Sequence, residues 1–243
     1  MADTSLLNAT GLSRSFGGVR AVSNLSFSIH QGEILGLIGP NGAGKSTTFN
    51  LVSGYYRPHA GRLVFAGRDI TGLKPSVVSR LGLVRTFQHN SLLGELTVYD
   101  NILTGCYAFL RDNAERDRRI RETADLVGLA ALLDEDGKNL PHGHQRLLSI
   151  AIAFASRPRL LCLDEPLTGL NGQEMTHALN VVRRIRDEFG TTILLVDHNM
   201  RAVMQMCGRI IVLNFGEKLA EGTPQEISSN PEVIRAYLGG DAA

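Results

Sequence analysis

Short apolar runs alternate along the chain with longer amphipathic segments. The clearest apolar runs are Ile34–Ile38, residues 160–163 and Thr192–Val196. Their length is typical of strands, whereas the segments between them have the wider spacing of helices. The alternation of the two patterns predicts an α/β fold.

All three apolar runs lead into residues that can carry chemistry. The first is followed by a glycine-rich loop containing Lys45, the second by Asp164 and Glu165, and the third by Asp197 and His198. In open α/β sheets, ligands bind at the carboxyl ends of the strands. We therefore expect these three strand ends to form one composite site.

Two regions have a different pattern of apolar and polar residues. Residues 25–29 alternate strictly between apolar and polar, and together with residues 62–70 they predict half-buried antiparallel strands near the N-terminus. Residues 88–157 have a helical pattern, and the charges of Asn113–Val127 indicate a solvated helix face. The sequence predicts a single domain of residues 1–243, in which residues 1–87 and 158–243 form the core and residues 88–157 a helical insertion.

Charge and composition narrow the classes of function. The chain has 243 residues and carries 25 Lys and Arg against 24 Asp and Glu, so its net charge of +1 gives no general electrostatic grip on nucleic acid. A hydrophobic content of 43% suffices for a sizeable core. No apolar run approaches the ~18 residues of a membrane span, and residues 1–7 lack the pattern of a secretion signal. We expect a soluble protein of the cytosol.

Residues 39–46 match the phosphate-binding pattern G-x-x-x-x-G-K-[ST] at every fixed position. Backbone N–H groups of such a loop cradle phosphate oxygens, and a helix expected over residues 47–53 adds its positive dipole end. Lys45 supplies a charge for the β- and γ-phosphates, and the Ser46 hydroxyl can ligate Mg²⁺. The predicted nucleotide-binding residues of this loop are Gly39, Pro40, Asn41, Gly42, Ala43, Gly44, Lys45, Ser46 and Thr47.

Two adjacent carboxylates, Asp164 and Glu165, follow the second apolar run. An Asp at such a strand end can hold Mg²⁺ through a water, and the next carboxylate can polarise a nucleophilic water against the γ-phosphate. Apolar runs that end in acidic residues are common, so the pattern gains its meaning from the phosphate-binding loop upstream. Together they predict a nucleotide site with hydrolytic chemistry.

With these motifs, the chain resembles the ATP-binding-cassette (ABC) family of ATPases over nearly its whole length. Gln88 matches the family's Q-loop glutamine, His198 its switch histidine, and Phe16 the aromatic residue that stacks on adenine. Residues 168–171 match the D-loop. The resemblance implies an α/β P-loop NTPase core with a mixed sheet, an N-terminal antiparallel β subdomain and an inserted α-helical subdomain.

The resemblance also implies ATP and Mg²⁺ as cofactors and a head-to-tail dimer, either a homodimer or a heterodimer with a similar subunit. Each nucleotide would lie between the P-loop of one chain and the signature segment of the other, where Gly143 would contact it. Glu165 would be the general base, and His198 would orient the γ-phosphate and water. The implied catalytic residues are Lys45, Glu165 and His198, and the implied metal ligands are Ser46, Gln88 and Asp164.

The signature segment departs from the family pattern Leu-Ser-Gly-Gly-Gln. This chain has Leu140, Pro141, His142, Gly143 and His144 there. Pro141 removes a hydroxyl and a backbone N–H that could serve the γ-phosphate of the partner. Two interpretations follow: either Gly143 and the helix start still support full hydrolysis, or the site is a weakened half-site that mainly binds ATP.

The finer resemblance is to the ATP-binding subunits of branched-chain amino acid importers. It rests on residues 85–89 around the Q-loop, on residues 169–171, and on the tail at residues 221–227 and 230–239. Related subunits that serve urea or other small solutes are similar, and so is the tail of the lipopolysaccharide-export ATPase. The transported substrate is selected by other subunits and cannot be inferred from this chain.

The importer resemblance implies transmembrane permease subunits as partners, a periplasmic solute-binding protein as an indirect partner, no nucleic acid, and a place on the cytoplasmic face of the cell membrane. Residues 89–97 are the candidate strip for contact with a permease. A soluble ABC ATPase acting on nucleic acid is disfavoured by the single cassette and the low net charge. A P-loop GTPase or kinase is disfavoured by the Q-loop, D-loop and switch histidine in family order.

Overall fold

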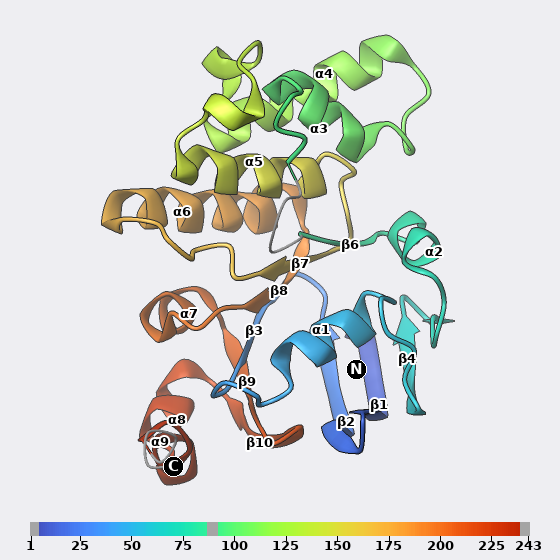
Figure 1. Cartoon of the computed structure of the whole chain (residues 1–243), viewed down its shortest axis with the longest axis vertical. Helices are drawn as coiled ribbons and strands as arrows, with labels where there is room; N and C mark the ends of the chain where they lie inside the picture. Colours follow the sequence, from blue (N-terminus) through green and yellow to red (C-terminus); the bar gives the residue numbers. More distant parts are fainter. Residues whose placement is uncertain (1–4, 87–91, 239–243) are drawn as a thin grey trace.

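The computed structural model describes residues 5–86 and 92–238. A six-stranded sheet lies at the centre, a four-stranded antiparallel sheet lies beside it, and three helices form a layer at the far end of the long axis (Figure 1). These helices are α3 (Val98–Cys106), α4 (Asn113–Val127) and α5 (His142–Phe154).

The three apolar runs of the sequence lie side by side in the central sheet. They form β3 (Ile34–Ile38), β8 (Thr192–Val196) and β7 (Leu160–Asp164), which pair in parallel with β8 in the middle. All three strands are buried along their whole length, and burial on both faces explains why their runs are continuously apolar. The sheet is completed by β6 (Leu83–Arg85), β9 (Arg209–Asn214) and the antiparallel edge strand β10 (Glu217–Gly222).

The N-terminal sheet has the antiparallel pairing that the alternating pattern predicts. Its strand order is β2-β1-β4-β5, and Leu25, Phe27 and Ile29 of β2 are buried between more exposed neighbours. The strands are β1 (Ser5–Phe16), β2 (Val19–His30), β4 (Ala60–Phe65) and β5 (Arg68–Asp69).

Two hydrophobic clusters cover opposite faces of the central sheet. On one face, Leu35 and Leu37 of β3 pack with α1 (Lys45–Val52) and the N-terminal sheet. On the other face, Ile34 and Ile38 belong to a cluster that runs through the helical layer. The remaining helices are α2 (Pro75–Arg80), α6 (Gly172–Phe189), α7 (Met200–Met206), α8 (Pro224–Ser229) and α9 (Pro231–Leu238), with the short turns η1 (Ala130–Leu132) and η2 (Gly137–Asn139).

The charge-rich segment Asn113–Val127 forms α4 with the bounds that its pattern predicts. Asp112 caps the helix start by accepting a hydrogen bond from the Glu115 backbone, and Gly128 ends the helix at a φ of 79°. None of its charged residues is buried, and Arg118, Arg121, Glu122 and Asp125 are exposed, while Ile120 is buried. The expectation of a solvated helix face is confirmed.

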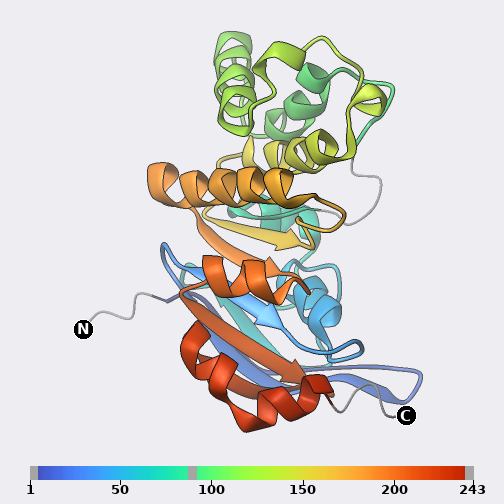
Figure 2. The same ribbon diagram turned by 90° about the vertical axis from the view of Figure 1, so that its left-hand side faces the viewer.

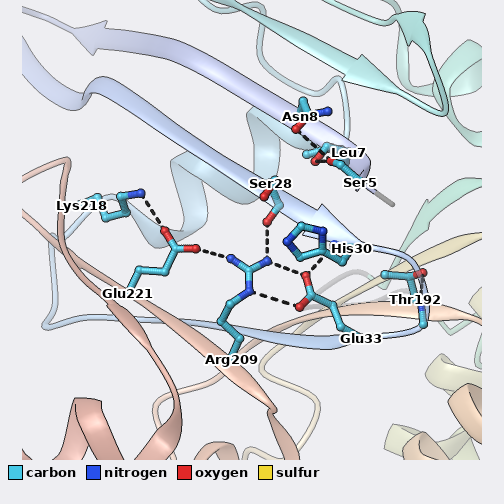
Figure 3. A network of polar contacts seen from close by, with 11 residues as sticks. Ser5, Leu7, Asn8, Ser28, His30, Glu33, Thr192, Arg209, Lys218 and Glu221 are labelled. Atoms are coloured by element: carbon cyan, nitrogen blue, oxygen red, sulfur yellow. Dashed lines mark hydrogen bonds and ion pairs between the residues drawn. The ribbon is translucent and has the colours of Figure 1, made fainter. Parts of the chain in front are cut away.

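A network of charged side chains connects the two sheets (Figure 3). Arg209 of β9 donates to the Ser28 carbonyl oxygen of β2 at 2.7 Å and pairs with Glu33 at 2.6 Å. It also forms an ion pair with Glu221 of β10. Glu221 forms a second ion pair with Lys218 at 2.7 Å. Arg209 therefore ties the N-terminal sheet to the edge of the central sheet.

Candidate functional site

The glycine-rich loop connects β3 to α1 and has the backbone form that its glycines allow. Gly39 has a φ of 153° and Gly44 a φ of 98°, both in the region that side chains disfavour. A Cβ at Gly39 would lie 2.2 Å from the Leu213 carbonyl oxygen, and one at Gly44 would lie 2.4 Å from the Ala21 oxygen. The loop is thus seated directly on β9 and β2, and glycine is required at both positions.

Lys45 is the first residue of α1 and points back into the loop. Its Nζ donates to the carbonyl oxygens of Gly39 at 2.7 Å and Pro40 at 3.0 Å. Burial lowers the pKa of Lys45, while the nearby carboxylates of Glu165 and Asp164 oppose this shift. The ammonium therefore lies close to both predicted acidic residues.

Ser46 and Thr47 stand in the first turn of α1, where the helix presents N–H groups without intrahelical partners. No acidic side chain lies in this first turn, and Gly44 caps it without a side-chain hydrogen bond. The positive end of the helix dipole is therefore available to an anion at the loop. Ser46 is exposed there, and Asn41 and Gly42 are also exposed.

Asp164 ends β7 as a buried carboxylate with an unsatisfied oxygen. Its Oδ2 lies 3.8 Å from an Arg85 nitrogen, while its Oδ1 is buried without a hydrogen-bond partner. Burial raises the pKa of Asp164 to about 6, against the opposing charge of Arg85. An orphaned carboxylate oxygen on a residue close enough to interact with the charge of Lys45 suits Mg²⁺, which prefers oxygen ligands.

Glu165 follows directly and has an uncommon backbone conformation with a φ of 49°. Its N–H donates to the Val196 carbonyl oxygen at 2.7 Å, which holds it beside the end of β8. His198 Nδ1 lies 3.3 Å from Glu165 Oε1, and His198 Nε2 lies 3.4 Å from the Thr168 hydroxyl. A strained residue held in this way is typical of an active site.

Three residues at this site have roles that the sequence analysis did not assign. The buried Asp197 accepts hydrogen bonds from the backbone N–H groups of Leu167 and Asn199, at 3.3 Å and 2.8 Å, and so joins the segment that follows Glu165 to the segment that follows His198. Thr86 is uncharged, and its hydroxyl oxygen accepts a hydrogen bond from the Asp164 backbone N–H at 3.1 Å. Arg85 pairs with Asp164. The only sequence signal for Asp197 was its place at a strand end.

The signature segment lies in another part of the molecule. Gly143, in the first turn of α5, is so close to Glu174 of α6 that a Cβ there would lie 2.5 Å from Glu174 Oε1. His142 faces Gly169 of the D-loop segment. In both views α6, β7 and β8 lie between α5 and α1 (Figures 1 and 2). The structure therefore places Gly143 apart from the P-loop of its own chain.

Phe16 ends β1 at the turn into β2. Its ring is 40% exposed, stands edge-on to Tyr56 with 5.2 Å between ring centroids, and is covered by Arg14. Phe16 therefore remains partly accessible to solvent at the end of β1. Gln88 lies outside the described residues. The structure thus brings Lys45, Asp164, Glu165 and His198 together, while Gly143 belongs to another surface. Phe16 pairs with Val19 at the start of β2, the strand whose Ala21 lies against Gly44 of the loop.

A phosphate-binding loop between a parallel strand and a helix, with an acidic pair on a neighbouring strand end, defines a P-loop nucleotide hydrolase. The profile of the ABC transporter family matches residues 22–168, and the chain belongs to this family of ATP-binding, ATP-hydrolysing transport proteins. A second profile, described as branched-chain amino acid ATP-binding cassette transporter, matches residues 217–243.

Curated relatives are similar to this chain over nearly the whole length of both proteins. The high-affinity branched-chain amino acid transport ATP-binding protein LivG of Salmonella typhimurium is 42% identical and covers 96% of this chain and 98% of its own. BraF of Pseudomonas aeruginosa, with the same description, is 37% identical over the same shares. The lipopolysaccharide export system ATP-binding protein LptB of Escherichia coli is 34% identical and covers 97% of this chain and 98% of its own.

Solved structures agree with the fold. A crystal structure of an ATP-binding cassette of an ABC transporter in its ADP conformation has a TM-score of 0.88 at 27% identity, over 98% of this chain and all of that one. A nucleotide-free cassette has a TM-score of 0.87 at 26% identity, over 96% of this chain and 98% of the other. The α/β fold with a mixed sheet and an N-terminal antiparallel sheet is confirmed. Within residues 5–86 and 92–238, none of the helices has the length and apolar character that crossing a membrane requires.

Proposed function

We propose that the chain is the ATP-hydrolysing subunit of an ABC importer for branched-chain or other hydrophobic amino acids, acting at the cytoplasmic face of the cell membrane. The observation that carries this proposal is the similarity to LivG and BraF over 96% of the chain, joined to the match of the C-terminal segment. We further propose residues 1–87 and 158–243 as the nucleotide-binding core and residues 88–157 as the helical signature subdomain.

In this proposal, nucleotide binds along residues 39–47. Backbone N–H groups of the loop and the start of α1 receive the phosphates, and Lys45 exchanges its two carbonyl acceptors for phosphate oxygens. The exchange is favourable because two neutral acceptors are replaced by charged ones. Phe16 offers its exposed ring face to the adenine.

Mg²⁺ fits the oxygen atoms at the loop. The unpartnered Oδ1 of Asp164 and the Ser46 hydroxyl would hold it, and Gln88 is the third proposed ligand. When bound, the ion neutralises charge on the β- and γ-phosphates. Arg85 lies 3.8 Å from Asp164 and sets the orientation of that carboxylate.

Glu165 is the proposed general base. Its carboxylate takes a proton from the attacking water, and His198, 3.3 Å away, orients the water and the γ-phosphate. Asp197 holds the backbone that follows each residue of this pair, which keeps the two side chains facing one another. Positioning of this kind is a large part of how proteins catalyse phosphoryl transfer.

A second chain is needed to complete each site in this proposal, because Gly143 contacts Glu174 rather than the P-loop of its own chain. Its proposed place is against the nucleotide of a partner, in a homodimer or with a sister subunit. His142 and His144 at the start of α5 favour a second candidate, a site that binds ATP and hydrolyses it weakly, because both replace residues of the family pattern.

The proposed partner in the membrane is a permease. An open groove of about 250 Å³ lies between β6, α3 and α5, and its lining is mainly apolar. Arg85 and Thr86 form part of this lining and also contact Asp164, so a segment seated in the groove would lie one contact away from the nucleotide site. Leu93 and Leu96, within the candidate strip 89–97, expose apolar surface as well.

The test is ATPase activity of the chain purified alone and with its neighbouring permease, sister ATPase and solute-binding proteins in vesicles. We expect hydrolysis that rises when the binding protein carries leucine, isoleucine or valine. A preparation with Glu165→Gln provides the background rate. Stimulation by urea or by lipopolysaccharide instead would contradict the amino acid assignment, and no activity above background in either preparation would establish the weak half-site.

A further inference from the structure

Arg85 ends β6, the edge strand of the central sheet, and reaches the helix that follows the P-loop. Its Nη1 donates to Asn50 Oδ1 at 2.5 Å and to the Ser53 hydroxyl oxygen at 3.2 Å. Its guanidinium carbon lies 4.5 Å from the ring centroid of Phe49 and 5.0 Å from that of Tyr55. One arginine therefore contacts α1 and the segment that follows it through polar and aromatic groups together.

The second terminal nitrogen of Arg85 faces the end of β7. Nη2 lies 3.8 Å from Asp164 Oδ2, and the two side chains are only 13% and 3% exposed. Opposite charges attract more strongly in such a place than in water, because little solvent screens them. The guanidinium is planar and rigid, so Arg85 joins α1 to the end of β7 at a fixed spacing.

The contacts of Arg85 lie on the side of α1 that carries Ser46. Asn50 follows Ser46 by four residues in this helix, so the two side chains lie on the same face. On β7, the carboxylate that faces Arg85 through Oδ2 is the one whose Oδ1 is buried without a hydrogen-bond partner. Arg85 thus contacts both elements that carry the proposed oxygen ligands of Mg²⁺. A guanidinium has no lone pair to offer a cation, so Arg85 is not itself a ligand.

We propose that Arg85 is a positioning residue for the metal site: it holds Ser46 of α1 and Asp164 of β7 at one spacing, so that both oxygens are in place before nucleotide and Mg²⁺ bind. This role rests on the Mg²⁺ site of the proposed function. Ligands that are already arranged lose less freedom on binding, so a broken tether weakens the metal-dependent part of ATP binding.

Arg85→Lys is the sharpest test, because it separates geometry from charge. Lysine keeps a positive charge beside Asp164 but lacks the planar fork that reaches Asn50 and Asp164 at the same time. Titrations with a fluorescent ATP analogue in a Glu165→Gln background measure binding without hydrolysis. We expect the Kd in saturating Mg²⁺ to rise roughly tenfold. The Kd in EDTA should stay within about twofold, because the phosphate contacts of the loop are unchanged.

Asn50→Ala tests the same tether from the helix side and leaves Arg85 with its charge in the chain. We expect a smaller rise of the Kd in Mg²⁺, by roughly threefold, and no change in EDTA. The double variant should be no worse than Arg85→Lys, because both changes break one connection. Arg159→Lys is the matched control: Arg159 is exposed just before β7, at the end of that strand opposite to Asp164, and its change should leave both Kd values unaltered.

The two Kd values distinguish positioning from general damage. A rise confined to Mg²⁺ in Arg85→Lys and Asn50→Ala supports the proposal, and if Arg85→Lys does not fold, Asn50→Ala decides it alone. Unchanged Kd values in Mg²⁺, additive effects of the two changes, or an equal rise in Mg²⁺ and EDTA overturn it. If the chain with Arg85 intact binds ATP equally well in Mg²⁺ and in EDTA, the proposed metal site fails, and the role of Arg85 fails with it.

Discussion

At the scale of single residues, the buried carboxylate of Asp164 costs the protein stability. Burial raises its pKa from an ordinary 3.8 to about 6, so the folded chain binds this proton more tightly than the unfolded chain. Stability from this group is therefore highest below about pH 4 and is lost as pH rises towards 6. This loss of stability accompanies a buried carboxylate oxygen that is free to bind a metal ion.

Asp164→Asn should remove this pH dependence. Between pH 5 and pH 8 the unchanged protein should lose about 1.4 kcal/mol of unfolding free energy that the Asn variant keeps, because an amide does not titrate. Urea unfolding in EDTA at both pH values measures the difference. Equal pH slopes for the two proteins would show that Asp164 is an ordinary carboxylate.

Glu165→Gln should stop hydrolysis without stopping binding. We expect kcat to fall by about 10²–10⁴, the usual contribution of a positioned base, while the affinity for ATP holds or rises because a negative charge near the phosphates is removed. Phosphate release and nucleotide titration measure the two effects. Glu188→Gln, a change at an exposed ion pair with Arg184, serves as the control. A Gln variant that still turns over would assign the base elsewhere.

Motifs predicted the residues proposed to contact nucleotide, and they missed residues that contact and orient these side chains. Lys45 was identified because the pattern of its loop is specific, whereas Asp164 gained its meaning from that loop upstream and His198 from the resemblance to the ABC family. The roles of Arg85 and Thr86 were not identified, because both contact Asp164, which is far away in sequence, and such pairs become visible only when the strands are packed. Long-range hydrogen bonds leave no periodicity that a sequence alone displays.

At the scale of elements, the start of α5 is locked to the start of α6. Asn171 caps α6 by accepting from the Glu174 backbone at 3.0 Å, and Glu174 accepts from the Asn171 N–H at 2.9 Å. The same Glu174 carboxylate lies against Gly143. The capping box of one helix thus fixes the position of the signature glycine on another.

Gly143→Ala should destabilise the chain by about 1–3 kcal/mol, because the added Cβ displaces Glu174 and breaks the capping box. In a Glu174→Ala background the same change should cost much less, because the obstacle is gone. Urea unfolding of the four proteins measures the coupling. Gly172→Ala, at a position with open space around it, is the control. Additive effects of the two changes would refute the contact.

Arg209→Met should also destabilise the chain, by about 2 kcal/mol, because Glu33 and Glu221 lose the cation that joins them. The three side chains are only 17–27% exposed, which makes this loss larger than for a surface pair. Lys218→Met, at the more exposed edge of the network, should cost no more than about 1 kcal/mol. The midpoints of denaturant unfolding measure the loss of stability in both variants. Equal losses for Arg209→Met and Lys218→Met would mean that the network does not join the sheets.

The bounds of elements were predicted best where the strand is buried along its whole length or the helix is capped at both ends. β3, β8 and α4 have the bounds that their patterns indicate, because burial or capping fixes both ends. The helix expected over residues 47–53 instead begins at Lys45, because Gly44 with its φ of 98° serves as the cap. The strand order was not predictable, since parallel neighbours are joined by long connections.

At the scale of the whole molecule, the candidate site is divided between two distant surfaces. Lys45, Asp164 and Glu165 gather at the ends of the central strands, whereas Gly143 lies beyond α6 (Figure 1). A single chain cannot bring its own α5 to its own P-loop without rearranging the core cluster that connects the helical layer to the sheet. Two chains placed head to tail can satisfy both halves at once.

Hydrolysis should therefore depend on chain concentration. In the dilute range the rate per chain should rise in proportion to concentration, because the active species is a pair. The Glu165→Gln chain, which retains ATP, should show by light scattering a mass near twice 26.4 kDa with ATP and near 26.4 kDa without it. A constant rate per chain would mean that one chain forms a complete site. A monomer with ATP that pairs only after the sister ATPase is added would establish the heterodimer instead.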